Sequence, residues 1–205
     1  MNEALTTEAF VLMKRPAASD GWHTFTVLSA EHGSLLVLQR LLRKPSKTQI
    51  PLDLFDEAAL ELETSNQGRT WFVREARLIA RHTEIGRSYA ALQGASALAR
   101  LLARNPVSPE SRVGVADLWR SALTAFDNGV RPEVAYFKSV YRFARDEGYP
   151  VKQEWIPSLS PSDRDAALAL LTRPLAEQTA TPEETARLQR HLDDYLRGST
   201  EILVG

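Results

Sequence analysis

The hydrophobic pattern of this chain changes its period near residue 83. Before that point, short runs rich in β-branched and aromatic residues are separated by turn-forming residues, and residues 60–63 alternate leucine with glutamate. After it, apolar residues recur at every third or fourth position, as they do along one face of an amphipathic helix. This order predicts an α+β protein in which residues 1–82 form a strand-rich domain and residues 83–205 form an all-helical domain.

The strand-rich region contains five apolar runs, each of which ends at a turn signal. Short strands at such spacing, with Gly, Pro and Asn at the breaks, favour a small sandwich or a barrel. A closed barrel has the advantage that it leaves no sheet edge open. The five runs cover residues 8–14, 22–30, 34–42, 54–64 and 69–82.

Helix-start and helix-stop signals are repeated in the second region. Pro132 stands where a first helical residue tolerates proline, and Gly148 ends the same pattern. A Ser-Pro pair at 160–161 provides an N-cap and a first helical residue, and Thr181 and Glu184 form a capping box. Together with the apolar spacing, these signals predict five helices after the small β-domain.

The residue inventory limits the chemistry of the chain. It has no cysteine, which excludes disulfides, thiol nucleophiles and cysteine-based zinc sites. The four histidines are far apart and share no metal-ligand spacing, and there is no phosphate-binding glycine loop or serine-hydrolase elbow. We therefore expect neither an enzyme nor a bound metal or cofactor.

The expected location follows from two negative observations. No apolar run approaches the roughly 20 residues that a membrane-spanning helix needs. The first ten residues, MNEALTTEAF, lack the basic and apolar parts of a secretory signal. The sequence therefore predicts a cytoplasmic protein that makes no contact with membranes.

A basic segment separates the third and fourth runs. Residues 40–47, RLLRKPSK, contain no acid, and Pro45 restricts the backbone, which lowers the entropy lost on binding. The net charge of the whole chain is only −1, so a role with nucleic acid depends on such local clustering. The predicted phosphate-binding side chains of this segment are Arg40, Arg43, Lys44 and Lys47.

A second set of cations lies along the fifth run, which is expected to be a strand. Arg74 and Arg77 are three positions apart. This spacing is odd, so on a regular strand their side chains cannot share a face. Trp71 and Phe72 stand among these cations, and core packing is the expected role of such aromatics, although one of them can stack on a base. The cations of the run are Arg69, Arg74, Arg77 and Arg81, of which the first three are predicted to bind DNA.

Three stretches, in this order and spacing, resemble the RecO family of bacterial recombination mediators. They are TTEAFVLMKRPAASDGWHTFTVLSAEHG at 6–33, RLLRKPSK at 40–47 and YFKSVYRFARDEGYPV at 136–151. The first is similar to the opening strands of the family, the second to its basic loop and the third to a helical segment that ends in Gly-Tyr. The resemblance covers about residues 6–152.

The resemblance implies an N-terminal five-stranded OB-fold barrel followed by an all-helical domain. It also implies binding to single- and double-stranded DNA, strand annealing, association with the nucleoid, and work with RecR and the single-stranded DNA-binding protein. Many members carry a four-cysteine zinc site after the Gly-Tyr motif. This chain has PVKQEWIPSL at that place and lacks the zinc module.

The resemblance further implies a binding site for the acidic C-terminal tail of the single-stranded DNA-binding protein. Lys138, Arg142 and Arg145 follow one another at spacings of four and three on the helix expected over 132–147, so they share a face. Arginine can bind a carboxylate through two parallel hydrogen bonds. Tyr141, next to Arg142, is expected to help line an apolar notch for the tail.

Two other functions stay open. Exposed lysine and arginine are normal on loops, so the chain can instead be a protein interaction adaptor whose basic segment is only solvated. An uncharacterised hydrolase is a third possibility, weakened by the lack of a catalytic motif. The salt dependence of DNA binding separates the mediator from the adaptor.

Overall fold

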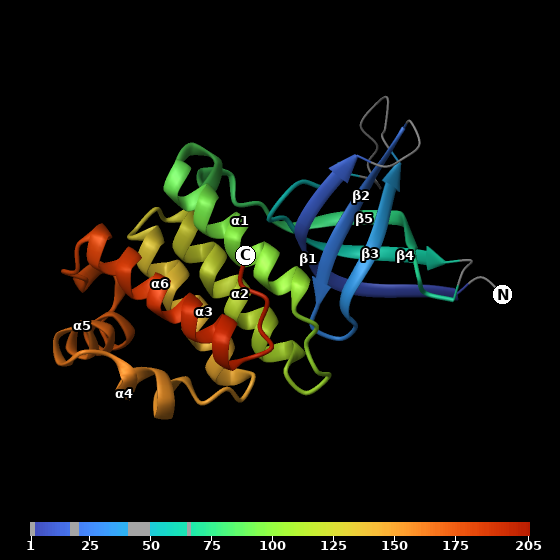
Figure 1. Ribbon diagram of the computed structural model, residues 1–205. Coiled ribbons are helices and arrows are strands. Elements are labelled where there is room, and N and C mark those ends of the chain that lie inside the picture. Colours follow the sequence, from blue (N-terminus) through green and yellow to red (C-terminus); the bar gives the residue numbers. More distant parts are fainter. Residues whose placement is uncertain (1–2, 17–20, 41–49, 65–66) are drawn as a thin grey trace. The chain divides into compact units, whose positions relative to one another are not determined.

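The chain contains two compact units, which are described separately (Figure 1). The computed structural model describes residues 3–16, 21–40, 50–64 and 67–205. The first unit comprises Met1–His82 and Pro106–Ala116, and the second comprises Thr83–Asn105 and Asp117–Gly205. Residues 106–116 thus group with the strands, although they lie after the single boundary expected at 82/83.

Five strands form one sheet in the first unit, ahead of the helices, which confirms the α+β class. They are β1 (Glu3–Pro16), β2 (Trp22–Ser29), β3 (Gly33–Arg40), β4 (Glu57–Thr64) and β5 (Trp71–Ala80). Antiparallel pairs join β1 to β2, β2 to β3, β4 to β5 and β1 to β4, and a parallel pair joins β3 to β5. The strand order β1-β2-β3-β5-β4 closes on itself as a barrel.

The core of the barrel comes from alternate residues of each strand. Phe25 and Val27 of β2 and Val37 of β3 are fully buried, whereas Thr26 and Leu36 at the intervening positions are partly or largely exposed. Burial of each large apolar side chain contributes about 1.5–3 kcal/mol, so the alternation decides which face points inward. The other core residues are Ala9, Val11, Leu52, Ala58, Leu60, Leu62, Trp71, Val73 and Ala76.

A β-bulge at Arg74 brings two arginines to the same face. Residues 61 and 62 of β4 pair with residues 75 and 73 of β5, so Arg74 is an extra residue without a partner position. Val73 and Ala76 are buried, while Arg74 and Arg77 are both exposed. The prediction that these arginines cannot share a face is therefore wrong, because the bulge shifts the alternation by one residue.

The second unit contains helices of very different length. They are α1 (Tyr89–Arg104), most of α2 (Arg112–Asp127), α3 (Pro132–Asp146), α4 (Ile156–Ser158), α5 (Pro161–Thr172) and α6 (Pro182–Ser199). Shorter turns are η1 (Thr83–Arg87), η2 (Val151–Trp155) and η3 (Leu175–Glu177). Five helices were expected, and the sixth, α4, has only 3 residues, too few to show a helical repeat in the sequence.

The cap signals predicted the helix ends correctly. Ser160 accepts a hydrogen bond from the backbone of Asp163, and Thr181 and Glu184 make the expected capping box. Pro132 is the first residue of α3, and Gly148 follows its end with a φ of 88°. Helix ends are set by such local bonds, which is why the sequence reveals them.

Apolar residues recur at spacings of three and four along α1 and α3, but not all of them are buried. Phe137, Val140 and Ala144 of α3 are fully buried, as the spacing predicts. On α1, Leu98 is buried, but Leu92 is 37% exposed and does not belong to the core side. None of the helices within the described ranges combines the length and apolar character that crossing a bilayer requires.

Candidate nucleic-acid interface

One outer face of the barrel is built from β2, β3 and the start of β5. The register places Trp22 opposite Arg40, Thr24 opposite Leu38, and Leu38 beside Phe72. These residues alternate with the buried ones, so their side chains point away from the core. We call this surface the β2–β3 face and define it by Trp22, Leu36, Leu38, Arg40 and Phe72.

The rings of Trp22 and Phe72 meet across β3. Their strands lie on either side of β3, which separates the two backbones by about 10 Å. The ring centroids are nevertheless 5.6 Å apart, with the planes at 77°, so the two side chains lean toward each other over β3. Such an edge-to-face contact suits the charge distribution of aromatic rings. Both residues are partly exposed, so the pair is part of the molecular surface.

Sequence reasoning singled out Trp71 and Phe72 but missed Trp22. Trp71 is buried in the barrel core, and Phe72 points outward, so core packing holds for only one of them. The sequence does contain a signal for Trp22, because Trp22 lies three positions before Phe25. On a strand, that spacing puts Trp22 outside when Phe25 is inside.

The β2–β3 face is free of acidic side chains on its own two strands. Neither β2 nor β3 contains Asp or Glu, and Arg40 is exposed at the end of β3. Glu63 of β4 lies next to Phe72 in the register, but the Nε atom of Arg74 is 3.2 Å from its carboxylate. The face therefore has a cation at one end, an apolar middle and a neutralised acid at its far edge.

The predicted DNA-binding cations do not all lie on one surface. Three cations of the basic segment, which we call the basic loop, lie outside the described residues: Arg43, Lys44 and Lys47. Arg40 belongs to the β2–β3 face. Arg69 is exposed in the turn before β5, and Arg77 is exposed on β5 opposite Ala59.

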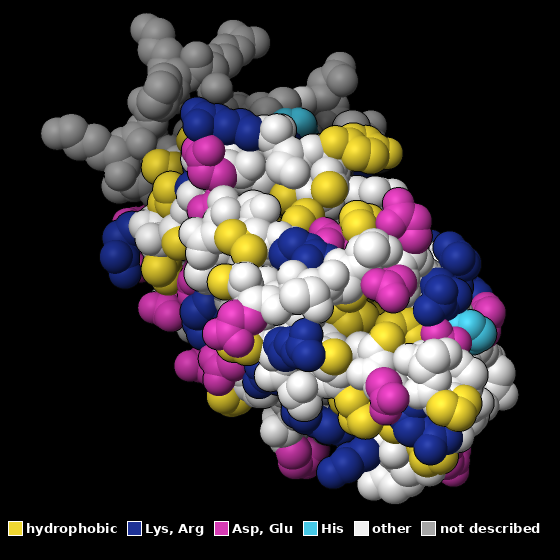
Figure 2. All heavy atoms as spheres, turned by 90° about the vertical axis from the view of Figure 1, so that its left-hand side faces the viewer, with side chains coloured by type: hydrophobic (Ala, Val, Ile, Leu, Met, Phe, Trp, Pro, Cys, Tyr) yellow, Lys and Arg dark blue, Asp and Glu magenta, His cyan; other side chains and the backbone are white. Residues whose placement is uncertain are grey.

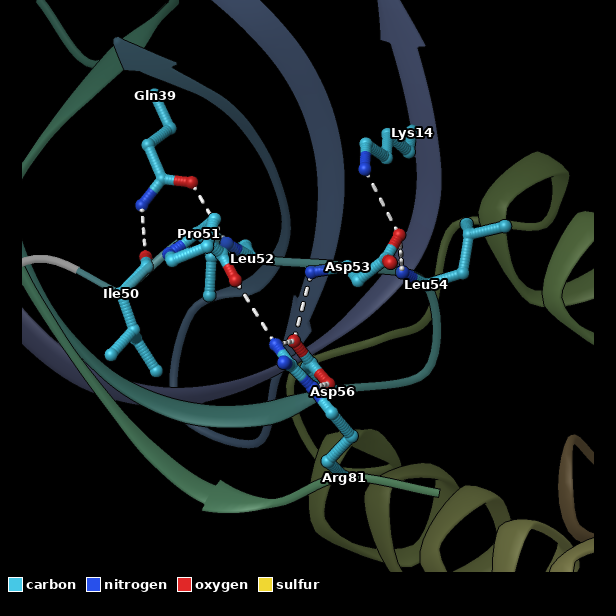
Figure 3. A network of polar contacts seen from close by, with 9 residues as sticks. All are labelled: Lys14, Gln39, Ile50, Pro51, Leu52, Asp53, Leu54, Asp56 and Arg81. Carbon is cyan, nitrogen blue, oxygen red and sulfur yellow. Dashed lines mark hydrogen bonds and ion pairs between the residues drawn. The ribbon is translucent and has the colours of Figure 1, made fainter. Parts of the chain in front are cut away.

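The arginine that follows β5 contributes to the structure of the barrel (Figure 3). Arg81 Nε and Nη2 donate to the two carboxylate oxygens of Asp56 at 2.8 and 2.5 Å, and Nη2 also donates to the carbonyl of Pro51 at 3.0 Å. Asp56 is fully buried, and the paired guanidinium neutralises it. The hydrogen bonds to Asp56 raise the pKa of Arg81 above its ordinary value. Arg81 is thus not one of the cations available to a ligand.

The segment that follows the basic loop is held to the barrel by side-chain contacts (Figure 3). Gln39 donates to the carbonyl of Ile50 at 2.7 Å and accepts from the amide of Leu52 at 2.9 Å. Lys14 bonds to Asp53 at 3.0 Å. Partial burial tends to raise the pKa of Asp53. The hydrogen bond from Lys14, together with the other hydrogen bonds and charges nearby, outweighs the effect of burial and holds the pKa below its ordinary value.

Two of the predicted partner-binding residues border a hollow in the second unit. The hollow has a volume of about 200 Å³, and Lys138 and Arg142 contribute to its lining. Lys138 Nζ donates to the carbonyl of Arg173 at 2.7 Å, and burial lowers the pKa of Lys138. Arg142 Nε is 3.3 Å from Asp146. The apolar lining includes Leu118, Ala122, Ala135 and Leu175.

The other two predicted partner-binding residues do not line this hollow. Tyr141 is 7% exposed, and its ring centroid lies 5.9 Å from that of Trp155, so it belongs to the core and not to a binding notch. It follows Val134 and Phe137 at helical spacing, which places it on the buried side of α3. Arg145 pairs with Asp146 at 2.7 Å.

The charges of the second unit are mixed. On the face shown in Figure 2, lysine and arginine side chains are interspersed with aspartate and glutamate. Many of them form local pairs, such as Arg187 with Asp163 and Arg197 with Asp194, at 2.7 and 2.8 Å. Such mixing gives no continuous basic stripe on this face.

The chain matches no family model and no curated protein, so no function can be transferred to it from a relative. Within the described ranges, no group of three or more metal-ligating side chains is placed to hold a metal ion. Function must therefore be inferred from the residues and their geometry.

Proposed function

We propose that this protein is a RecO-like mediator of DNA repair and recombination that binds single- and double-stranded DNA and brings complementary strands together. The proposal takes the closed five-stranded barrel to be an OB-fold. OB-folds bind oligonucleotides on the outer face of strands 2 and 3 and on the loops that join strands 1–2 and 4–5. In this chain, those loops lead directly into Trp22 and Trp71, beside the β2–β3 face.

The observation that carries the proposal is the charge of that face. Residues 22–29 and 33–40 contain no acid, Arg40 is exposed among them, and the basic loop continues the chain directly after it. Phosphates are attracted to positive surfaces and repelled by acidic ones. The face thus combines the fold position and the charge that a single strand requires.

The proposed mechanism is electrostatic and needs no catalytic group. Contacts to phosphates carry no sequence information, so any strand is bound. Once phosphates are neutralised, two complementary strands repel each other less and pair more readily. A protein that acts on chromosomal DNA together with RecR would be located in the cytoplasm, at the nucleoid.

The same proposal includes a protein partner, and the hollow lined by Lys138 and Arg142 is its proposed binding site. The mainly apolar lining of this hollow, which includes two cations, suits a peptide that is acidic and ends in an apolar residue with a free carboxylate, such as the tail of the single-stranded DNA-binding protein. Replacing Arg142 with Ala should weaken binding of a tail peptide by about 1.5–3 kcal/mol, measured by calorimetry. Equal affinity in a folded variant would place the tail elsewhere.

A protein interaction adaptor is the alternative, and one observation favours it. Leu36 is 43% exposed on the β2–β3 face, next to further apolar side chains, and such surfaces can bind protein. An adaptor of this kind would bind its partner through apolar contacts and would show no steep dependence on salt.

Fluorescence anisotropy with a labelled single-stranded oligonucleotide tests the proposed function. From about 50 to 200 mM salt, the logarithm of the binding constant should fall linearly with the logarithm of the salt concentration, with a slope of about −0.7 for each phosphate neutralised. Binding that is absent at low salt, or that ignores salt, would favour the adaptor.

A second set of measurements tests the basic loop. Changing Arg43, Lys44 and Lys47 together to Ala should weaken binding for every sequence and lower the salt slope by about two to three units. The control variant removes the same number of positive charges, three, from exposed arginines of the second unit. It should keep the wild-type slope. It changes Arg87, Arg120 and Arg197 to Ala.

A further inference from the structure

We propose that Trp22 and Phe72 form a stacking site for unpaired nucleobases. The β2–β3 face then binds a single strand through its bases as well as its phosphates. This inference rests on the proposed function, because it assumes that nucleic acid reaches this face.

The geometry of the two rings supports such a site. In their edge-to-face contact, with centroids 5.6 Å apart, one ring uses only its edge, so its flat faces are not taken up by the other ring. Both rings are partly exposed at the surface. Nucleobases stack on the faces of aromatic side chains whatever their sequence, because every base has a π-face.

The surroundings of the rings suit a nucleotide. Arg40 is the residue directly opposite Trp22 in the register, and directly opposed side chains begin only about 5 Å apart. A cation is thus placed beside an aromatic ring, as a phosphate is placed beside its base. Leu36 and Leu38 extend the apolar surface along β3.

The same chain offers an internal contrast to Phe72. Its neighbour Trp71 is also aromatic, but Trp71 packs in the barrel core, where large apolar side chains are needed. Nothing in the core requires a ring at position 72 or 22, because both positions point outward. A threonine, as at positions 24 and 26 of β2, would satisfy the strand equally well.

A stacking site makes the face selective for single strands. In a duplex, each base is paired and lies between its neighbours, so its faces are not accessible without unstacking, which costs a few kcal/mol. Phosphate contacts alone provide no such selection. Stacking therefore adds a preference for single strands to binding that is otherwise tolerant of strand and sequence.

Three labelled probes of equal length test the proposal on the wild-type protein. They are an oligothymidylate, an abasic phosphodiester strand without bases, and a duplex. The oligothymidylate should bind about 5- to 150-fold more tightly than the abasic strand, which corresponds to one stacked base. Equal binding of these two would overturn the stacking site but leave phosphate binding standing. If none of the three binds, the proposed function fails, and this inference fails with it.

Three variants then locate the site. Trp22→Leu and Phe72→Leu keep an apolar side chain but remove a flat ring, and each should reduce the preference for oligothymidylate over the abasic strand by at least about threefold. Trp22→Phe keeps a ring and should retain most of the preference. Tyr89→Leu is the matched control, because Tyr89 is 81% exposed and lies outside the barrel strands. A preference unchanged in both ring-removing variants, shown to be folded by circular dichroism, would overturn the assignment.

Discussion

β3 and β4 belong to the same barrel, but their outer sides carry opposite signs. The outer side of β3 carries Leu36, Leu38 and Arg40, whereas that of β4 carries Glu61 and Glu63 without a cation of its own. Both strands bury similar residues on their inner sides, among them Val37 and Leu60. The fold therefore sets the inner residues of the two strands and leaves the outer ones free to differ.

The difference indicates the side from which an anionic ligand approaches. Glu61 lies directly opposite Glu75 of β5, an arrangement that destabilises a sheet because like charges repel. The two opposed acids disfavour a phosphate at this point of the sheet, whereas the β2–β3 face is the proposed phosphate-binding side. The contrast predicts that a strand follows β2 and β3 and avoids β4.

The largest expected effect is a loss of stability, and it distinguishes an arginine that stabilises the barrel from those predicted to bind DNA. Arg81→Ala removes the partner of the fully buried Asp56 and should lower the free energy of unfolding by about 3 kcal/mol, measured by urea titration. Arg77→Ala, an exposed cation on β5, should change it by less than about 0.5 kcal/mol. A loss below about 1 kcal/mol for Arg81→Ala would show that the ion pair does not stabilise the barrel.

A smaller effect is expected at Gln39, on the inner side of β3. Gln39→Leu leaves the carbonyl of Ile50 and the amide of Leu52 without their partner and should cost about 2 kcal/mol of stability. Ser34→Ala, at an exposed position of the same strand, serves as the control. An unchanged urea midpoint would mean that the segment after the basic loop is held by other contacts.

The smallest effect tests the acidic side itself. Glu61→Gln relieves the repulsion from Glu75 and should raise the free energy of unfolding by about 0.5 kcal/mol. The gain should shrink at high salt, because exposed charges are screened. A loss of stability would show that the paired acids do not oppose each other across the strands.

Local signals predicted most of the fold. Turn residues separated the five strands, and the bonds of Ser160 and Thr181 set the starts of two helices, because caps involve only residues close in sequence. The first strand begins at Glu3, earlier than its apolar run, because pairing with β4 extends it. Such extension depends on a partner strand and is not visible locally.

The candidate site was less predictable, because it depends on register. The meeting of Trp22 and Phe72 joins residues 50 positions apart, and the pairing of Arg81 with Asp56 decides which arginine is available. The bulge at Arg74 reversed an argument from strand alternation. A pattern in one strand contains no information on the strand beside it, so these features required the structure.

A charge-matched pair of variants tests the central claim most directly. Arg40→Gln and Thr6→Glu each lower the net charge by one, the first on the β2–β3 face and the second at an exposed position opposite Glu61. In anisotropy titrations with a single-stranded oligonucleotide, Arg40→Gln should weaken binding at least about threefold and lower the salt slope by about one unit. Thr6→Glu adds a carboxylate opposite Glu61 and is used only after circular dichroism shows that it is folded; it should then stay within about twofold of wild type, because it reaches the bound strand only through screened, distant charge. Equal effects of the two variants would contradict the account, since the β2–β3 face would then have no special role.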